Sequence, residues 1–292
     1  WLWNTTGELI AGVTNTPGNA ANQLSKPWNI YLDETNNYLY IADSENHRIQ
    51  RWSIGSSTGV TVAGTSTAGS LNTELNVPKD VFIDSSQNIY VADSNNNRIQ
   101  YFPFGSLTGV TVSTSWSSPG SLWGVQLFNQ SIYACSNGKS IIYKNGTTLI
   151  SSLNSPQGFN IDKLYSLGTI YIVNSGAHTI IKWPVGASSG SIVAGVAGSS
   201  DSTPTKLKYP VAIALDSYAN LFVADNNNHR IQLFCQYPIA NSTGRTIAGT
   251  TGVSGITLDK LTYPAGVTLD SSLNLYVSDT SNHRILKFKR IK

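Results

Sequence analysis

Short apolar runs alternate with polar turns along the whole chain, and one such pattern returns several times. Its clearest copy is NLFVADNNNHRIQ at Asn220 to Gln232, an apolar strand ending in Asp, an Asn-rich turn, and His-Arg opening a second strand. Close variants occupy 37–50, 88–100 and 274–286, and weaker ones occupy 131–142 and 169–181. Repetition at a near-constant period predicts a repeat architecture.

Each copy extends into a longer unit of four predicted strands, a to d, with a period of about 50 residues. Strand a reads P-x-x-Φ-x-Φ-D at 27–33, 78–84, 156–162, 210–216 and 264–270, while 122–128 lacks the Pro and the Asp. Strand d ends in small residues at 59–64, 109–114, 190–195 and 244–249, with 147–152 in the third unit. The a–b and b–c links are polar turns typical of antiparallel hairpins.

The strands lack clean alternation, which indicates small sheets covered on both faces, as in a β-propeller. The last unit ends after strand c, and GELIAG at 7–12 has the pattern of the missing strand d. We therefore predict an all-β, six-bladed β-propeller of four-stranded antiparallel blades, closed by the N-terminal strand pairing with the C-terminal blade. The predicted single domain, 1–292, comprises the closing strand at 1–12 and blades at 24–64, 75–114, 119–152, 153–195, 207–249 and 261–292.

The N-H-R-I-Q turn, the A-D before it and the P-x-G-Φ-x-Φ-D strand resemble the NHL repeat over essentially the whole chain. This resemblance implies a six-bladed propeller. The third and fourth copies depart from the motif: Cys135 and Asn174 replace Asp, and Ser140 and Thr179 replace Arg. A role that needs a complete set of motifs is not expected in those copies.

The recurring ionisable residues are interpreted as architecture, because a catalytic site needs one special copy. Asp and Arg stand five residues apart in four units: Asp43/Arg48, Asp93/Arg98, Asp225/Arg230 and Asp279/Arg284. We expect each carboxylate to accept N–H groups of its own turn, and each Arg to pair with it across the hairpin or to reach the next blade. The unrepeated Asp80, Asp201 and Asp259 form no recognisable acid pair, so no catalytic residue is predicted.

The four His residues, His47, His178, His229 and His283, are also in register. Packed sheets stand ~10 Å apart, whereas zinc needs bonds of ~2 Å, so neither a metal site nor a cofactor is predicted. The aromatic residues ending strand c are predicted to pack between blades: Trp52, Phe102, Trp183, Phe234 and Phe288. The two cysteines, Cys135 and Cys235, are predicted not to pair with each other.

In a propeller the d–a and b–c loops emerge on one face, where a rim of Asn, His, Tyr, Trp and Lys could bind a protein segment or a glycan. Ordinary solvated turns are the alternative. The candidate binding residues are Lys26, Trp28, His47, Asn97, Trp123, Tyr209, His229, Tyr263 and His283. The glycosylation sequons, at Asn4, Asn129, Asn145 and Asn241, fall in links of the opposite face and would leave the first face for partners.

Charged residues make up only 12% of the chain, and the net charge is +3. No apolar run approaches the ~18 residues of a membrane span, and the chain begins at Trp1 without any Met. We expect a mature product or an excised domain, secreted or extracellular, that acts as a non-enzymatic binding or assembly module with a protein or glycan partner or by self-association.

Two alternatives stay open. An RNA-binding NHL propeller needs a basic face, but Lys and Arg are scattered apart from the tail at 287–292, so nucleic acid is not the expected partner. A metal-dependent lyase or lactonase-like enzyme needs convergent acids that the sequence does not reveal. The amidating lyases that resemble NHL propellers bind metal through His, whereas here every His lies in a turn.

Overall fold

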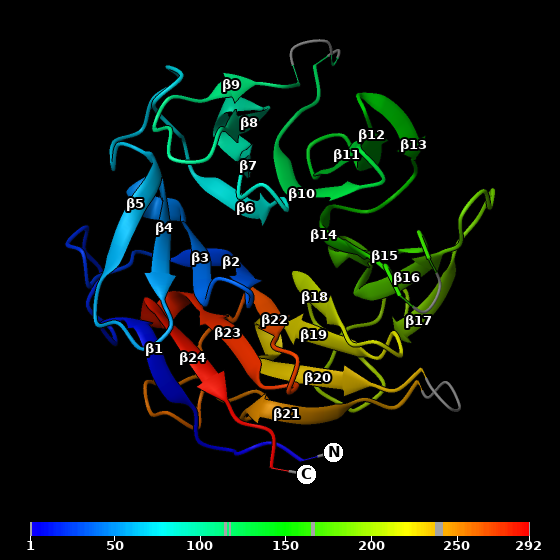
Figure 1. The fold of residues 1–292 in the computed structure, drawn as a ribbon. Coiled ribbons are helices and arrows are strands. Elements are labelled where there is room, and N and C mark those ends of the chain that lie inside the picture. The colour runs from blue at the N-terminus through cyan, green and yellow to red at the C-terminus, as the bar shows by residue number, and fades with distance from the viewer. Residues whose placement is uncertain (1, 114–115, 117, 165–166, 237–241, 292) are drawn as a thin grey trace. The chain divides into compact units, whose positions relative to one another are not determined.

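The computed structural model describes residues 2–113, 116, 118–164, 167–236 and 242–291. Six four-stranded antiparallel sheets account for the strands, one sheet for each repeat (Figure 1). The fold is an all-β, six-bladed β-propeller, as the repeat pattern predicts. Within blades 1 to 5 the strands follow one another in sequence order, because the links are hairpins.

The strands of the first three blades are as follows. Blade 1 contains β2 (Pro27–Asp33), β3 (Tyr38–Asp43), β4 (Arg48–Ser53) and β5 (Gly59–Gly64). Blade 2 contains β6 (Pro78–Ile83), β7 (Ile89–Asp93), β8 (Arg98–Phe102) and β9 (Val110–Thr111). Blade 3 contains β10 (Leu122–Phe128), β11 (Ser131–Ser136), β12 (Ile141–Lys144) and β13 (Thr147–Ile150). β9 is shorter than the predicted 109–114, and residue 114 lies outside the described residues.

The other blades follow the same plan. Blade 4 contains β14 (Pro156–Ile161), β15 (Ile170–Asn174), β16 (Thr179–Trp183) and β17 (Ser191–Gly195). Blade 5 contains β18 (Ala212–Leu215), β19 (Leu221–Asp225), β20 (Arg230–Phe234) and β21 (Arg245–Gly249). Blade 6 contains β22 (Val267–Leu269), β23 (Leu275–Asp279) and β24 (Arg284–Phe288).

The N-terminal strand β1 (Glu8–Gly12) completes blade 6, whose strand order is β1-β24-β23-β22. Nearby, the Asn4 N–H donates to the Lys289 carbonyl oxygen over 2.8 Å. The predicted pairing of the first strand with the last blade is confirmed.

Contacts divide the chain into two compact units. Unit 1 contains residues 1–9, 154–282 and 286–292, and unit 2 contains residues 10–153 and 283–285. In unit 2, Tyr40 and Ile49 of blade 1 share a buried core with Val91 and Phe102 of blade 2. Burial of such side chains contributes about 1.5–3 kcal/mol each.

Unit 1 has the equivalent core between blades 4 and 5, in which Tyr171 and Ile180 pack with Val223 and Phe234. The predicted inter-blade packing of the aromatic residue that ends strand c is therefore confirmed at Phe102 and Phe234.

The b–c link is a short 3₁₀ turn in five blades, a geometry that the sequence pattern did not predict: η1 (Ser44–Asn46), η2 (Ser94–Asn96), η3 (Ser175–Ala177), η4 (Asn226–Asn228) and η5 (Thr280–Asn282). The turn of blade 1 ends at His47 in the left-handed region, with φ 51°. A Cβ at Gly64 would lie 2.3 Å from the His47 carbonyl oxygen, and Gly64 itself has φ +84°. In blade 1, β5 therefore has to end in Gly for the b–c turn to fit beside it.

Candidate functional site

Each repeated Asp holds the d–a loop that enters its own blade. Asp43 Oδ1 accepts the Ser25 N–H over 2.7 Å, and Oδ2 accepts Asn46 Nδ2 and Arg48 Nε, each over 2.8 Å. Burial raises the pKa of Asp43, and these three donors oppose the rise. The same three contacts recur at Asp93 with Asn76, Asn96 and Arg98, and at Asp225 with Lys208, Asn228 and Arg230.

These contacts correct one prediction and confirm another. The Asp side chains do not cap the backbone of the 3₁₀ turn that follows them, so the expectation of an Asx-type turn is wrong, and the turn donates only through its Asn side chain. The incoming loop supplies the backbone donor instead. The Arg pairing is confirmed for Asp43, Asp93 and Asp225, and the Asp279/Arg284 pair stays a prediction.

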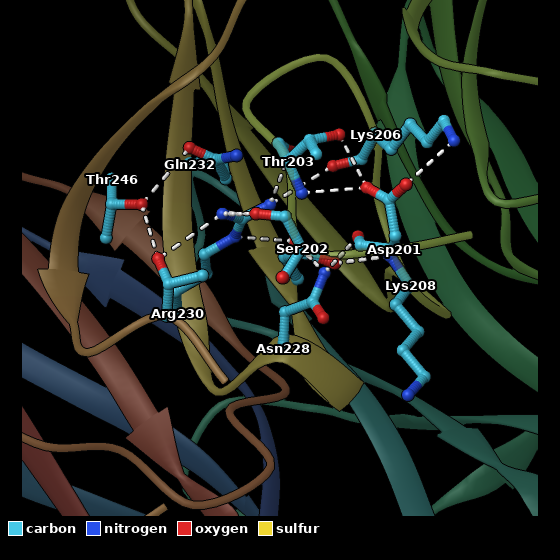
Figure 2. A network of polar contacts seen from close by, with 11 residues as sticks. Asp201, Ser202, Thr203, Lys206, Lys208, Asn228, Arg230, Gln232 and Thr246 are labelled. Carbon is cyan, nitrogen blue, oxygen red and sulfur yellow. Dashed lines mark hydrogen bonds and ion pairs between the residues drawn. The ribbon is translucent and has the colours of Figure 1, made fainter. Parts of the chain in front are cut away.

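The guanidinium of each paired Arg reaches further into the same loop, as Figure 2 shows for blade 5. Arg230 Nη1 donates to the Ser202 carbonyl over 2.8 Å, and Nη2 donates to the Thr203 and Lys206 carbonyls, each over 3.1 Å. The side chains of Asp225 and Arg230 are almost fully buried, so the pair fastens the loop and is not open to a substrate.

The unrepeated Asp201 belongs to this same loop (Figure 2). Its carboxylate accepts the Thr203 N–H over 2.7 Å and Lys206 Nζ over 2.7 Å. The hydrogen bonds from Lys206 and Thr203 lower the pKa of Asp201 to about 2. Asp201 therefore orders a turn.

The His residues tie neighbouring blades together, a role that the sequence did not reveal. His47 Nδ1 accepts the Val77 N–H over 3.1 Å, and His229 Nδ1 accepts the Tyr263 N–H over 3.2 Å. His178 and His283 accept the N–H groups of Tyr209 and Lys26 in the same way. Every donor directly precedes the Pro of its repeat. Burial lowers the pKa of His229 and His283, in keeping with neutral acceptors.

The copies that depart from the motif keep part of the network. Asn174 Oδ1 accepts the Asn154 N–H over 2.6 Å, as the Asp would, while the buried Thr179 hydroxyl has no hydrogen-bond partner within the described part of the chain. Cys135 is buried and free, and Cys235 is half-buried and free. Across the described ranges, no group of three or more His, Cys, Asp or Glu side chains could hold a metal ion.

A second, unrepeated cluster lies in unit 2, where β6 packs between β2 and β10. Trp28, Lys79 and Trp123 occupy the second position of these three strands and are partly exposed. The two indoles meet edge to face, with centroids 5.4 Å apart at 88°. Lys79 Nζ lies 3.6 Å from the Trp28 ring centroid and 5.1 Å from that of Trp123. We call Trp28, Lys79 and Trp123 the Trp–Lys–Trp cluster.

Lys79 is a partly desolvated cation. Burial lowers its pKa to about 8, with Glu45 opposing the shift and Lys26 adding to it. Contact with two indole faces favours the charged ammonium by ~1–2 kcal/mol. Sequence reasoning found the two Trp residues but missed Lys79. The signal that could have found Lys79 is its position: it is the second residue of its strand, as Trp28 and Trp123 are in the first strands of the two adjacent blades.

Asp80 lies next to Lys79 in β6 and connects the same three strands. Its Oδ1 accepts Asn29 Nδ2 of β2 over 2.7 Å, and its Oδ2 accepts the Val125 N–H of β10 over 2.9 Å. Burial raises the pKa of Asp80 to about 7. Burial, and then the charge of Asp80, raises the pKa of the Cys135 thiol.

The other candidate residues form smaller groups within their units. In unit 1 the rings of His229 and Tyr263 meet with centroids 4.6 Å apart. In unit 2, Lys26 Nζ lies 3.9 Å from Glu45 Oε1. Asn97 is exposed at the end of its turn, with φ 53°. Among the sequons Asn4, Asn129 and Asn145 are exposed, whereas Asn241 lies outside the described residues.

The four-stranded sheets and the repeated loop network define a β-propeller. The family model named NHL repeat matches residues 24–52, 75–102 and 261–288. These segments lie within blades 1, 2 and 6, so the propeller carries NHL repeats in these three blades. Among curated proteins, no sequence matches the chain significantly.

Several solved structures share the fold at low sequence identity. An auxiliary nutrient binding protein from Bacteroides thetaiotaomicron has a TM-score of 0.76 and 16% identity over 99% of this chain and 77% of its own. One from Bacteroides ovatus has a TM-score of 0.74 and 14% identity over 100% and 78%. Virginiamycin B lyase from Staphylococcus aureus has a TM-score of 0.58 and 13% identity over 94% and 98%. At these identities the similarity establishes the fold alone.

Proposed function

We propose that this propeller is a non-enzymatic binding module displayed outside the cell. Its ligand is a protein segment or a glycan, or a second copy of the chain, taken up beside the b–c and d–a loops. The observation that carries the proposal is the Trp–Lys–Trp cluster, which is unrepeated, partly exposed and outside the network that fastens the loops.

The arrangement of the loops supports this reading. In blade 1 the Glu45 N–H of the b–c turn donates to the Ser25 carbonyl of the d–a loop over 3.1 Å, so the two loops lie side by side. In blade 5 the Asn227 N–H makes the equivalent bond to the Lys208 carbonyl. A rigid rim presents side chains at a low entropic cost of ordering, which favours binding.

The recurring acids and His residues offer little for chemistry, because their polar atoms hold loops and blades. Asp43, Asp93 and Asp225 are fully buried in ion pairs, and each His accepts a backbone N–H through Nδ1. The structural neighbours include proteins named for nutrient binding as well as a lyase, so binding without turnover has to be tested directly.

The test is a screen of the intact protein against immobilised glycans and peptides, followed by mass spectrometry of every ligand that binds. We expect saturable binding that is lost in Trp28→Ala/Trp123→Ala and kept in Phe104→Ala, a substitution of an exposed aromatic residue in a c–d link. The recovered ligand should be chemically unchanged. A cleaved or isomerised ligand would contradict the non-enzymatic reading, and light scattering that detects dimers would favour self-association.

We also propose that the exposed sequons carry glycans, which would fit display outside the cell. Asn145 already uses its side chain, since Oδ1 accepts the Ile132 N–H over 2.8 Å, whereas Asn4 and Asn129 are exposed. The native protein should lose mass in hexose-containing steps on glycosidase treatment. An unchanged intact mass would refute glycosylation.

A further inference from the structure

The Trp–Lys–Trp cluster contains donors that nothing in the described chain satisfies. Lys79 Nζ has three N–H donors, yet across the described residues it contacts two indole faces and bonds to no oxygen. The Trp28 indole N–H also lacks an acceptor among the described residues, unlike that of Trp123, which donates to Ser121 Oγ over 2.8 Å. An ammonium held between aromatic rings gains most from an anionic acceptor supplied by a ligand.

The charges around Lys79 fit an anionic ligand. Glu45 and Lys26 are the charged groups that act on it, and they face each other at 3.9 Å, so their fields partly cancel. Asp80, the next residue, directs its carboxylate to Asn29, Val81 and Val125 instead. The positive charge of Lys79 is thus not neutralised by a carboxylate of the described chain.

The aromatic rings fit a sugar. Two partly exposed indoles, packed edge to face at 88°, offer apolar surface beside the Lys79 ammonium, which suits the C–H face of a pyranose ring. A sugar acid combines this face with a carboxylate in one rigid molecule. A peptide carboxy terminus has the carboxylate but lacks the rigid apolar ring.

We propose that Trp28, Lys79 and Trp123 form a binding site for a carboxylated sugar, in which the Lys79 ammonium pairs with the carboxylate and the indoles flank the ring. This inference rests on the proposed binding function and names its ligand class. Asp80 and Asn29 are positioning residues, because their hydrogen bonds connect the three strands that carry the cluster.

The test is calorimetric titration of the intact protein with glucuronic acid. Glucose, which lacks the carboxylate, and acetate, which lacks the ring, should bind at least tenfold more weakly. Lys79→Met should weaken glucuronic acid at least tenfold, and Lys79→Arg should restore part of the affinity. The matched control is Lys182→Met, because Lys182 also lies over an aromatic ring, that of Tyr171, with Nζ 5.9 Å from its centroid.

Thermal melting of each variant separates lost binding from lost folding. Equal binding of glucuronic acid and glucose, or unaltered binding by Lys79→Met, would overturn the proposal, as would tighter binding of an acetylated peptide with a free carboxy terminus. If glucuronic acid fails while a screened ligand still binds, this inference falls and the proposed function stands. If no screened ligand binds, both fall.

Discussion

The first strands of the blades in unit 2 differ from their counterparts in unit 1. Strands β2, β6 and β10 carry Trp28, Lys79 and Trp123 in the second position. The matching residues of unit 1, which follow the Pro of each repeat, are the buried Gln157 of β14, Val211 just before β18 and Ala265 ahead of β22. In the third position unit 2 has Asn29, Asp80 and Gly124, and unit 1 has Gly158, Ala212 and Gly266. The same segment of the repeat is thus buried in unit 1, whereas in unit 2 it leaves Trp28, Lys79 and Trp123 partly exposed.

The spacing between neighbouring first strands explains part of this difference. A Cβ at Gly158 would lie 2.9 Å from the Val211 carbonyl oxygen, so in unit 1 the strands approach too closely for a side chain. In unit 2 the Asp80 side chain fills the corresponding place and is bonded on both sides. Unit 2 therefore differs from unit 1 by Asp80, which links three strands, and by the cation of Lys79 beside it.

The largest effect should come from the network that the two units have in common. Arg48→Met in unit 2 and Arg230→Met in unit 1 should each lower the free energy of unfolding by about 3–5 kcal/mol, because a buried carboxylate loses its partner. Urea denaturation measures both, and Lys206→Met, which removes a solvent-exposed ion pair, should lower the free energy of unfolding far less than either Arg variant. Losses under 1 kcal/mol in both Arg variants would refute the structural role of the network.

Asp80→Ala should lower the free energy of unfolding, measured by urea denaturation, by about 3 kcal/mol. The reason is that Asn29 Nδ2 and the Val81 and Val125 N–H groups lose their acceptor. Gly158→Ala at the matching position of unit 1 should cost about 1–3 kcal/mol for the opposite reason, since it adds an atom where none fits. If Asp80→Ala is neutral, Asp80 does not connect the strands.

The pH dependence of stability should also differ at Asp80. Its pKa is about 7 in the folded protein, against an ordinary value of 3.8 for an Asp side chain. Between these values the folded state holds a proton that the unfolded state has lost, so stability falls as pH rises, and above pH 7 it becomes flat. Relative to that of Asp80→Asn, the free energy of unfolding of the unaltered protein should fall by up to about 1.4 kcal/mol per pH unit across this window. Parallel stability curves from pH 4 to pH 8 would contradict a buried, proton-binding Asp80.

The smallest effect should come from Lys79→Met, which is expected to change the free energy of unfolding by less than about 1 kcal/mol, because the desolvation of the ammonium offsets most of its attraction to the two rings. A small loss in Lys79→Met beside a large loss in Asp80→Ala would show that Lys79 presents a charge to a ligand, whereas Asp80 connects strands. A loss as large as that of Asp80→Ala would make Lys79 a structural residue.

Much of the fold could be predicted because the repeat places each strand and turn in register. The place of the N-terminal strand, residues 8–12, could be predicted because the last repeat lacks a fourth strand of its own. The site was less accessible to sequence reasoning. Lys79 and Asp80 look like ordinary variable residues of a P-x-x-Φ-x-Φ-D strand, and only the packing of β6 between β2 and β10 shows that their partners are Trp28, Trp123 and Asn29. The role of Nδ1 in His47 and His229 likewise depends on contacts with another blade.

The most direct test of the account is a crystal structure of the protein with glucuronic acid bound. We expect a carboxylate oxygen at ~2.8 Å from Lys79 Nζ, with the sugar ring against Trp28 or Trp123. A sugar bound instead beside Tyr209 and Tyr263, with Lys79 making no contact to it, would contradict the account.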